Sequence, residues 1–316
     1  MKKVLITGIS GFVGSYLGQL LLEKGFEIVG TYLTDESKDS LPNKEKYTLH
    51  KLNLIDEKST WELIEKEQPD QIYHLAALPA TRDSFDNPKE TFINNVSSQI
   101  SILEAVKKTG LKNTKILIVS SAEVYGLVSK DNLPINEEVP FNPTNPYAVS
   151  KLTQDMLGLQ YFLSDQLKII RVRPFNHVGP RQSPQFAVSA FAKKIAEIEK
   201  GKEKIMKVGN LDSSRDFTDV RDMVKAYVLA LDLGKEGDVY NLGSGKSYKI
   251  SEILDMYISM SRVKITVEKD RSLIRRSDDP QLLCDSSKFR KLTGWKPEIP
   301  IEKTLKDTLE YWREVI

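Results

Sequence analysis

A short apolar segment runs directly into a glycine-rich turn at the start of the chain. Val4–Thr7 is followed by Gly8, Gly11 and Gly14, spaced GxxGxxG rather than GxGxxG, and the amphipathic stretch Phe12–Lys24 begins inside the turn. Gly8 permits a tight turn, Gly11 lets a pyrophosphate approach the backbone, and Gly14 lets a helix pack close to the strand. The helix N-terminus then offers N–H groups to phosphate. The turn predicts a strand–helix unit that binds a dinucleotide; the alternative is a turn that binds nothing.

Short apolar runs alternate with amphipathic stretches through the first half of the chain. Such alternation predicts βαβ units with right-handed crossovers, and uninterrupted apolar runs are typical of parallel strands covered on both faces. We therefore expect an α/β fold with a doubly wound parallel sheet, the Rossmann fold. The predicted strands are Val4–Thr7, Glu27–Tyr32, Thr48–Leu52, Gln71–Leu75, Lys115–Ser120 and Lys168–Val172. The predicted helices are Phe12–Lys24, Lys58–Lys66, Lys89–Lys108 and Pro146–Leu163.

The regular alternation of apolar and amphipathic segments ends at about residue 175, after which prolines and glycines become frequent. No linker or repeat separates the two parts. We expect a dinucleotide-binding Rossmann domain over residues 1–174 and a smaller C-terminal substrate-binding lobe over residues 175–316. Some segments of this lobe, such as Val239–Asn241, are expected to return to the main domain. The helices predicted here are Phe186–Lys200, Ile250–Ser261 and Ile301–Glu314.

Composition narrows the class of protein. Lysine plus arginine number 46 and aspartate plus glutamate 44, so the net charge of +2 gives no global attraction to nucleic acid or to an acidic membrane. Cys284 is the only cysteine, which fits a reducing compartment, and no stretch approaches the roughly 18 apolar residues of a membrane span. We expect a cytoplasmic protein with no nucleic-acid or membrane partner. The histidines His50, His74 and His177 are too scattered to predict a metal site; His74 is expected to be structural, and His177 structural or a ligand contact.

Tyr147 and Lys151 form a YxxxK pair at the start of a predicted helix. Residues four apart share a helix face, so the ammonium is expected near the phenol. A nearby positive charge lowers a tyrosine pKa, which makes Tyr147 a candidate general acid–base. The alternative is a partly buried tyrosine beside an exposed lysine. About 25 residues earlier, Ser121 and Glu123 follow the end of the predicted strand Lys115–Ser120. Ligands gather at the carboxyl ends of parallel strands, so both side chains are expected in the same crevice.

Taken together, these motifs resemble the nucleotide-sugar branch of the extended short-chain dehydrogenase/reductase family. The resemblance covers nearly the whole chain. The matching segments are Thr7–Gly14, His74–Ala77, Ser120–Gly126, Pro146–Lys151, Arg173–Pro180, Arg215–Asp222 and Thr293–Pro297. Within this branch the chain is most similar to reductases of GDP-4-keto-6-deoxy-mannose, on the segments Phe175–Ser183, Phe191–Gly201, Val208–Asp222 and Thr293–Pro300.

The resemblance implies an enzyme that reduces the C4 ketone of GDP-4-keto-6-deoxy-mannose to GDP-rhamnose or its C4 epimer. The base and the stereochemistry cannot be read from the residues themselves. GDP-mannose 4,6-dehydratase stays open because a carboxylate at Glu123 also suits dehydration. A nucleotide-sugar 4-epimerase is a further alternative. A non-catalytic sensor that binds the cofactor is the least favoured, because the chain keeps both Tyr147 and Lys151.

The same resemblance implies roles for individual residues. Tyr147 would donate a proton to the ketone oxygen, Ser121 would hydrogen-bond that oxygen, and Lys151 would bind the nicotinamide ribose. The implied catalytic residues are Ser121, Glu123, Tyr147 and Lys151. The implied cofactor-binding residues are Gly8, Gly11, Phe12, Val13, Gly14, Asn53, Leu54, Leu75, Ala76, Ala77, Tyr147 and Lys151. The implied substrate-binding residues are Ser121, Asn176, Arg215 and Arg275, the two arginines on the diphosphate.

Two further expectations concern the cofactor and the assembly. The residues leave NAD and NADP open, because Asp35 lies just beyond its strand and no arginine is placed to bind a 2′-phosphate; we slightly favour NADP. The family resemblance also implies a homodimer through the helices near residues 89–108 and 146–163. These helices carry more apolar residues than one face needs, among them Phe92, Val96, Ile100, Met156, Leu157 and Tyr161.

Overall fold

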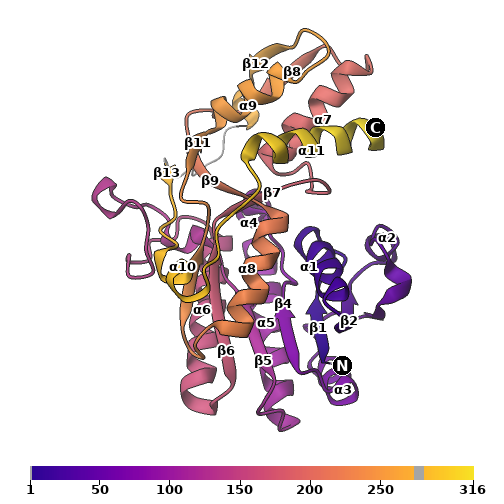
Figure 1. Cartoon of the computed structure of the whole chain (residues 1–316), viewed down its shortest axis with the longest axis vertical. Helices are drawn as coiled ribbons and strands as arrows, with labels where there is room; N and C mark the ends of the chain where they lie inside the picture. Colours follow the sequence, from indigo (N-terminus) through magenta and orange to yellow (C-terminus); the bar gives the residue numbers. More distant parts are fainter. Residues whose placement is uncertain (1, 274–280) are drawn as a thin grey trace.

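A parallel sheet forms the centre of the molecule. The computed structural model describes residues 2–273 and 281–316. Seven strands lie in the order β10-β6-β5-β4-β1-β2-β3, and the chain reverses direction across the sheet between β1 and β4, which confirms the doubly wound fold (Figure 1). The predicted strands are all present, with ends shifted by one or two residues. They are β1 (Lys3–Thr7), β2 (Glu27–Tyr32), β3 (Thr48–Lys51), β4 (Gln71–His74), β5 (Lys115–Val119), β6 (Lys168–Pro174) and β10 (Val239–Leu242).

Successive residues of each strand are buried under opposite layers of helices. In β1, Val4 and Ile6 pack with apolar residues of α1 and α8, whereas Leu5 packs with those of α3, α5 and α6. This burial on both faces is the reason that the strands read as continuous apolar runs. The helices are α1 (Phe12–Glu23), α3 (Glu57–Glu67), α5 (Pro88–Lys108), α6 (Pro146–Asp165) and α8 (Val220–Leu233).

Helix α8 was not predicted from the sequence. Met223, Tyr227 and Leu231 recur at helical spacing and are fully or almost fully buried against the sheet. Charged residues open the segment, among them Asp219, Arg221 and Asp222, and they obscured this spacing. The predicted return of Val239–Asn241 is confirmed, because β10 pairs with β6 in parallel. Three short helices were also missed: α2 (Asp35–Asp39), α4 (Thr81–Asp86) and α10 (Ser287–Thr293).

Most of the later elements pack around a second apolar core of their own. This core lies beyond the carboxyl ends of the central strands (Figure 1). Its main sheet is centred on β9 (Ser214–Asp219), which pairs with β7 (Asn176–Val178), β11 (Ser247–Lys249) and β13 (Gln281–Leu282). A separate pair consists of β8 (Ile205–Val208) and β12 (Thr266–Lys269). The helices are α7 (Ala187–Glu199), α9 (Ile250–Ser259) and α11 (Ile301–Val315). Across residues 2–273 and 281–316, no helix combines the length and the apolar character needed to cross a bilayer.

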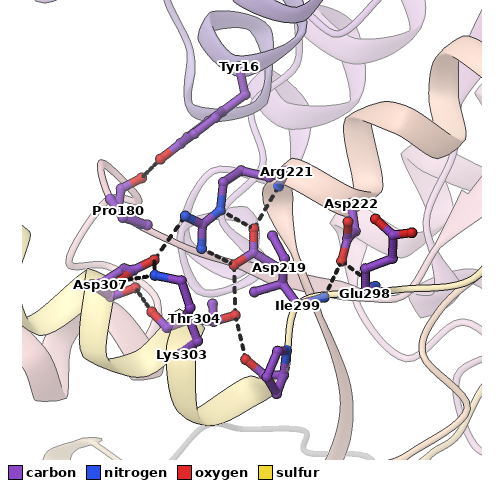
Figure 2. Close-up of polar contacts among 12 residues, drawn as sticks. Tyr16, Pro180, Asp219, Arg221, Asp222, Glu298, Ile299, Lys303, Thr304 and Asp307 are labelled. Atoms are coloured by element: carbon purple, nitrogen blue, oxygen red, sulfur yellow. Dashed lines mark hydrogen bonds and ion pairs between the residues drawn. The ribbon is translucent and has the colours of Figure 1, made fainter.

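An ionic contact joins the start of α8 to the C-terminal helix α11 (Figure 2). Asp219 caps α8 and accepts hydrogen bonds from Arg221 Nε and Nη2 at 2.8 and 2.7 Å. Arg221 Nη1 also pairs with Asp307 of α11 at 2.8 Å, and Thr304 donates to the Asp219 carboxylate at 2.7 Å. These bonds fix α11, whose apolar face belongs to the second core, against α8, which covers the central sheet.

Candidate active site

A cleft of about 490 Å³ opens at the carboxyl ends of the central strands. Its volume is in the usual range for small-molecule sites, and its position is where doubly wound folds bind ligands. Most of the residues that the sequence singled out line it. They are Gly8, Gly11, Phe12, Val13, Gly14, Asn53, Leu54, Leu75, Ala76, Ala77, Ser121, Glu123, Tyr147, Lys151 and Asn176.

The glycine turn has the geometry that a pyrophosphate needs. Gly8 adopts φ +67°, and a Cβ on Gly14 would lie 2.3 Å from the Gly8 carbonyl oxygen. The Gly11 N–H donates to that same oxygen at 3.0 Å, and α1 begins at Phe12 without a side-chain cap. The first N–H groups of a helix lack acceptors within the helix, and Phe12 and Val13 line the cleft. The turn therefore fits the diphosphate of a dinucleotide.

The end of β2 presents hydroxyl groups to the cleft. Thr31, Thr34 and Ser37 line it, and the Thr34 hydroxyl caps α2 by accepting from the Ser37 N–H at 3.3 Å. The carboxylate of Asp35 instead pairs with Lys51 of β3. An acidic residue at this point would favour a ribose 2′-hydroxyl and repel a 2′-phosphate. The ion pair of Asp35 with Lys51 therefore leaves this end of the cleft compatible with NADP.

Two helix caps hold the predicted reaction centre together. Ser121 caps the short 3₁₀ helix η2 (Ala122–Tyr125) by accepting from the Glu123 N–H at 3.2 Å. Asn145 caps α6 by accepting from the Ala148 N–H at 2.8 Å, and it also donates to Glu123 at 3.2 Å. Tyr147 follows directly in the first turn of α6. The caps thus bring Ser121, Glu123 and Tyr147 into one corner of the cleft.

The phenol of Tyr147 stays protonated at neutral pH. Burial raises its pKa above the ordinary tyrosine value, a hydrogen bond with Ser121 lowers it, and the charge of Glu123 raises it. The sequence predicted a lowered pKa from the neighbouring ammonium of Lys151, and this prediction is wrong. The cause is burial of the phenol, together with an ammonium whose hydrogen bonds go to a main-chain carbonyl and to Gln154.

Lys151 is buried against neutral acceptors. Its ammonium donates to the Val119 carbonyl at 2.8 Å and to Gln154 Oε1 at 2.9 Å. Burial lowers the pKa of Lys151 to about 7. An ammonium carries three N–H donors, so one donor is left after these two bonds. Because Lys151 lines the cleft, that donor suits a ligand hydroxyl such as that of a ribose.

Strand β7 supplies Asn176 and His177 to the lining of the cleft. The His177 ring stacks on Phe12 with centroids 6.1 Å apart and planes at 9°. Its Nδ1 lies 3.2 Å from the Phe175 carbonyl oxygen, and burial lowers the pKa of His177. His177 therefore supports the glycine turn and lines the cleft at the same time, so both roles considered for it are compatible with its position.

One of the two predicted diphosphate arginines, Arg215, can be located in the structure. Arg215 lies on β9, is buried, and donates to the Ser214 carbonyl at 2.9 Å. It does not belong to the cleft lining among the described residues. Arg275 lies outside the described residues. A diphosphate role for both arginines therefore stays a prediction.

Several cleft residues were missed by the sequence analysis. Tyr227 belongs to α8, and the only signal for it was the helical spacing of buried residues in a helix that was itself missed. Gln182 and Phe186 follow β7 in an irregular segment, and Leu282 belongs to the short strand β13. Gln182 lies within Phe175–Ser183, a segment matched to the reductases, but nothing in that match marked its side chain. Phe186 and Leu282 carry no local motif, and Leu282 reaches the cleft by packing with Tyr125 and Phe175.

Comparison with known proteins agrees with this arrangement. A family model described as GDP-mannose 4,6 dehydratase matches residues 5–308. GDP-6-deoxy-D-mannose reductase of Pseudomonas aeruginosa is 34% identical over 98% of this chain and 97% of its own length. GDP-mannose 4,6-dehydratase of Yersinia enterocolitica is 32% identical over 96% of this chain and 91% of its own length. The solved structure of RMD from Pseudomonas aeruginosa complexed with NADPH has a TM-score of 0.88 at 33% identity and covers 100% of both chains. The chain therefore belongs to the GDP-mannose 4,6-dehydratase family, within the extended short-chain dehydrogenase/reductase fold that its motifs resemble.

Proposed function

We propose that this protein is an NAD(P)H-dependent reductase of the C4 ketone of GDP-4-keto-6-deoxy-mannose, which it converts to GDP-rhamnose or the C4 epimer. The observation that carries the proposal is the meeting of three side chains, Ser121, Tyr147 and Lys151, with the glycine turn in one cleft. The similarity over nearly full length to the reductase of Pseudomonas aeruginosa supports this substrate over other sugar nucleotides.

The protonated phenol of Tyr147 suits ketone reduction. The reaction adds a hydride to C4 and a proton to the carbonyl oxygen, and a bound reduced nicotinamide supplies the hydride. Burial and the nearby carboxylate of Glu123 keep Tyr147 protonated, so it can donate the proton as negative charge develops on the oxygen. Ser121 holds the same oxygen, and its hydrogen bond with Tyr147 supports this role.

The cleft residues divide between cofactor and substrate. The glycine turn holds the dinucleotide diphosphate, Lys151 binds the nicotinamide ribose, and the segments 53–54 and 75–77 line the adenine and nicotinamide sides. Ser121 and Asn176 face the sugar nucleotide, with Arg215 and Arg275 on its diphosphate. We slightly favour NADP over NAD, because Asp35 is engaged with Lys51 and the similar reductase structure was solved with NADPH.

GDP-mannose 4,6-dehydratase is the second candidate function. Glu123 lines the cleft beside Tyr147, and its carboxylate accepts a hydrogen bond from Asn145 at 3.2 Å. A carboxylate in this place can remove the C5 proton that dehydration requires. The similarity to the dehydratase of Yersinia enterocolitica also supports this alternative.

We also propose a cytoplasmic homodimer with two functional lobes. Phe92 of α5 and Val149 and Met156 of α6 are exposed large apolar residues on the two helices predicted to pair. Val96 and Tyr161 are buried within the chain and so are not available to a partner. The lobes are residues 1–174 for the dinucleotide and 175–316 for the sugar nucleotide, and the position of α8 and β10 on the central sheet supports the return of some later segments.

The test is to measure the absorbance of the reduced nicotinamide when GDP-4-keto-6-deoxy-mannose is supplied with NADPH or with NADH. In a third mixture GDP-mannose is supplied with NADP⁺ and the formation of a ketosugar is measured directly, because a dehydration regenerates its NADP⁺ and leaves the absorbance unchanged. Stoichiometric loss of the band with the ketone establishes the reductase and identifies the preferred cofactor. No loss with the ketone, together with formation of a ketone from GDP-mannose, contradicts the reductase and establishes the dehydratase.

A further inference from the structure

A buried glutamine contacts the ammonium of Lys151 and has no assigned part in the reaction. Gln154 Oε1 accepts from Lys151 Nζ at 2.9 Å. Its Nε2 donates to the Asn95 carbonyl at 2.8 Å and lies 3.3 Å from His74 Nε2. Gln154 is 0% exposed and His74 2%. Water therefore does not compete for these bonds, and each polar atom depends on its protein partner.

The partners of Gln154 fix which of its atoms faces Lys151. An ammonium can only donate, so the amide oxygen must face it. The amide nitrogen then donates to the Asn95 carbonyl and lies against His74 Nε2. The other ring nitrogen of His74, Nδ1, lies 2.9 Å from the Thr7 hydroxyl. Burial lowers the pKa of His74 to about 3, so the ring is neutral at neutral pH.

The far end of this chain of bonds reaches the wall of the cleft. The Thr7 hydroxyl accepts from the Leu75 and Ala76 N–H groups at 3.1 Å each. Leu75 and Ala76 line the cleft beside the glycine turn. One continuous set of buried hydrogen bonds thus connects the floor of the dinucleotide site, through His74 and Gln154, to the ammonium of Lys151.

Few ionisable groups lie close enough to the Lys151 ammonium to change its pKa. Burial is the cause of the lowered pKa of Lys151, and Gln154 contributes a neutral acceptor. Helix α5 presents neutral groups to Gln154, namely the Gln99 side chain and the Asn95 carbonyl. Strand β5 presents the Val119 carbonyl to Lys151. The titratable groups near Lys151 are His74 from β4, Tyr147 on α6 and, around Tyr147, Glu123 of η2 and Tyr227 of α8. One turn further along α6, the buried carboxylate of Asp155 is paired with Arg171 and Arg173 of β6. The charged residues of α4, which are Arg82, Asp83 and Asp86, are exposed.

We propose that Gln154 is a positioning residue that, held by His74, aims the Lys151 ammonium at the ribose of the bound dinucleotide. Gln154 is fully buried and does not belong to the cleft lining among the described residues, so it acts through Lys151. The inference rests on the proposed function, because it takes the ribose role of Lys151 from there. It adds that the direction and the charge of Lys151 depend on a second residue, three positions along the same helix.

Three variants test this role. Gln154→Met keeps the length of the side chain and removes the acceptor, and Gln154→Glu replaces the acceptor with a carboxylate. Gln99→Leu is the matched control, because Gln99 is equally buried and donates to the main-chain carbonyl of Gln154 at 2.8 Å, away from the ammonium. The titration midpoint of Lys151, which is the pH at which its side chain is half protonated, is measured by NMR with ¹³C-labelled lysine in the full chain without ligand. The spectrum of Lys151→Met identifies its signal.

The proposal predicts shifts of opposite sign. Gln154→Met lowers the midpoint by about 1 pH unit, because a charged donor loses its acceptor. Gln154→Glu raises it by about 1 unit or more, because an opposite charge lies within bonding distance. Gln99→Leu leaves it unchanged. NADPH affinity at pH 7, measured by nicotinamide fluorescence, falls several-fold in Gln154→Met and not in Gln99→Leu.

Other results separate this role from a structural one. If Gln154→Met lowers the melting temperature as much as Gln99→Leu does and leaves the Lys151 midpoint in place, Gln154 is merely structural and the proposal is overturned. The proposal is also overturned if Lys151 of the wild-type protein has the same titration midpoint as the surface lysines. If Gln154→Glu does not fold, Gln154→Met decides alone. The titration uses neither substrate nor cofactor, so a protein that shows these shifts but reduces no ketone contradicts the proposed function and not the positioning role.

Discussion

Two buried charged side chains, Lys151 and Asp155, lie one helical turn apart on α6, and their partners differ. The fully buried carboxylate of Asp155 pairs with Arg171 and Arg173 of β6, with Arg173 Nε at 2.7 Å. The ammonium of Lys151 contacts only neutral oxygen atoms among the hydrogen bonds described for it. Burial opposes the charge of Arg173, but Asp155 outweighs it and raises the pKa of Arg173, whereas burial lowers the pKa of Lys151 to about 7.

The difference in partners indicates different roles, a structural one for Asp155 and a functional one for Lys151. A buried charge with an ionic partner keeps its ionisation state over the whole physiological range, and removal of the partner is costly. A buried charge without such a partner is easily changed by ligands and pH, which is typical of catalytic groups. We therefore expect the Asp155 site to stabilise the fold and the Lys151 site to control binding and chemistry.

The largest effect is expected from breaking the paired site. Asp155→Asn leaves two buried guanidinium groups without a compensating charge, so the free energy of unfolding should fall by about 3–5 kcal/mol. Urea denaturation with an unchanged m-value measures this loss. A loss below about 1 kcal/mol would show that the pairing of Asp155 with the two arginines does not support the fold.

A pH-dependent effect is expected from the unpaired site. The pKa of Lys151 is about 7 in the folded protein, below its ordinary value of 10.5. Between these pH values the unfolded chain binds more protons, so Lys151 should make stability rise with pH, by up to about 1.4 kcal/mol per unit. Lys151→Met lacks this term and should be at least as stable as wild type at pH 7. Urea denaturation of both proteins from pH 7 to 10 measures the difference, and parallel curves would contradict it.

The smallest effect is expected from an ion pair near the surface at the end of the same helix. Asp165, the last residue of α6, pairs with Lys107 of α5 at 2.8 Å. Water and side-chain entropy weaken such pairs, so Asp165→Asn should cost less than about 1 kcal/mol. The same urea denaturation makes it the matched control for Asp155→Asn. Equal losses in the two variants would remove the distinction between buried and exposed pairs.

The central sheet could be predicted from the sequence because its signals are local. The apolar runs Val4–Thr7 and Lys115–Ser120 each fix a buried strand, and the glycine turn fixes where the first helix begins. Parallel strands end at the same edge, so Ser121 and the glycine turn had to meet. The YxxxK spacing then placed Tyr147 and Lys151 beside them.

The parts that the sequence analysis missed depend on tertiary packing. The direction of the Tyr147 pKa depends on its burial and on where the Lys151 ammonium donates, and neither follows from helical spacing. Gln154 looks like any polar helix residue until β4 places His74 against it. Arg215 belongs to a motif of the family, yet β9 buries it away from the cleft lining.

The central claim is that Tyr147 gives its proton to a ketone, and Tyr147→Phe tests it most directly. The measurement is the single-turnover rate of NADPH oxidation with GDP-4-keto-6-deoxy-mannose, together with NADPH affinity by fluorescence. If Tyr147 is the proton donor, the rate falls at least about 100-fold below wild type, and NADPH affinity changes by no more than a few-fold. A variant that reduces the ketone at the wild-type rate would show that Tyr147 is not the proton donor.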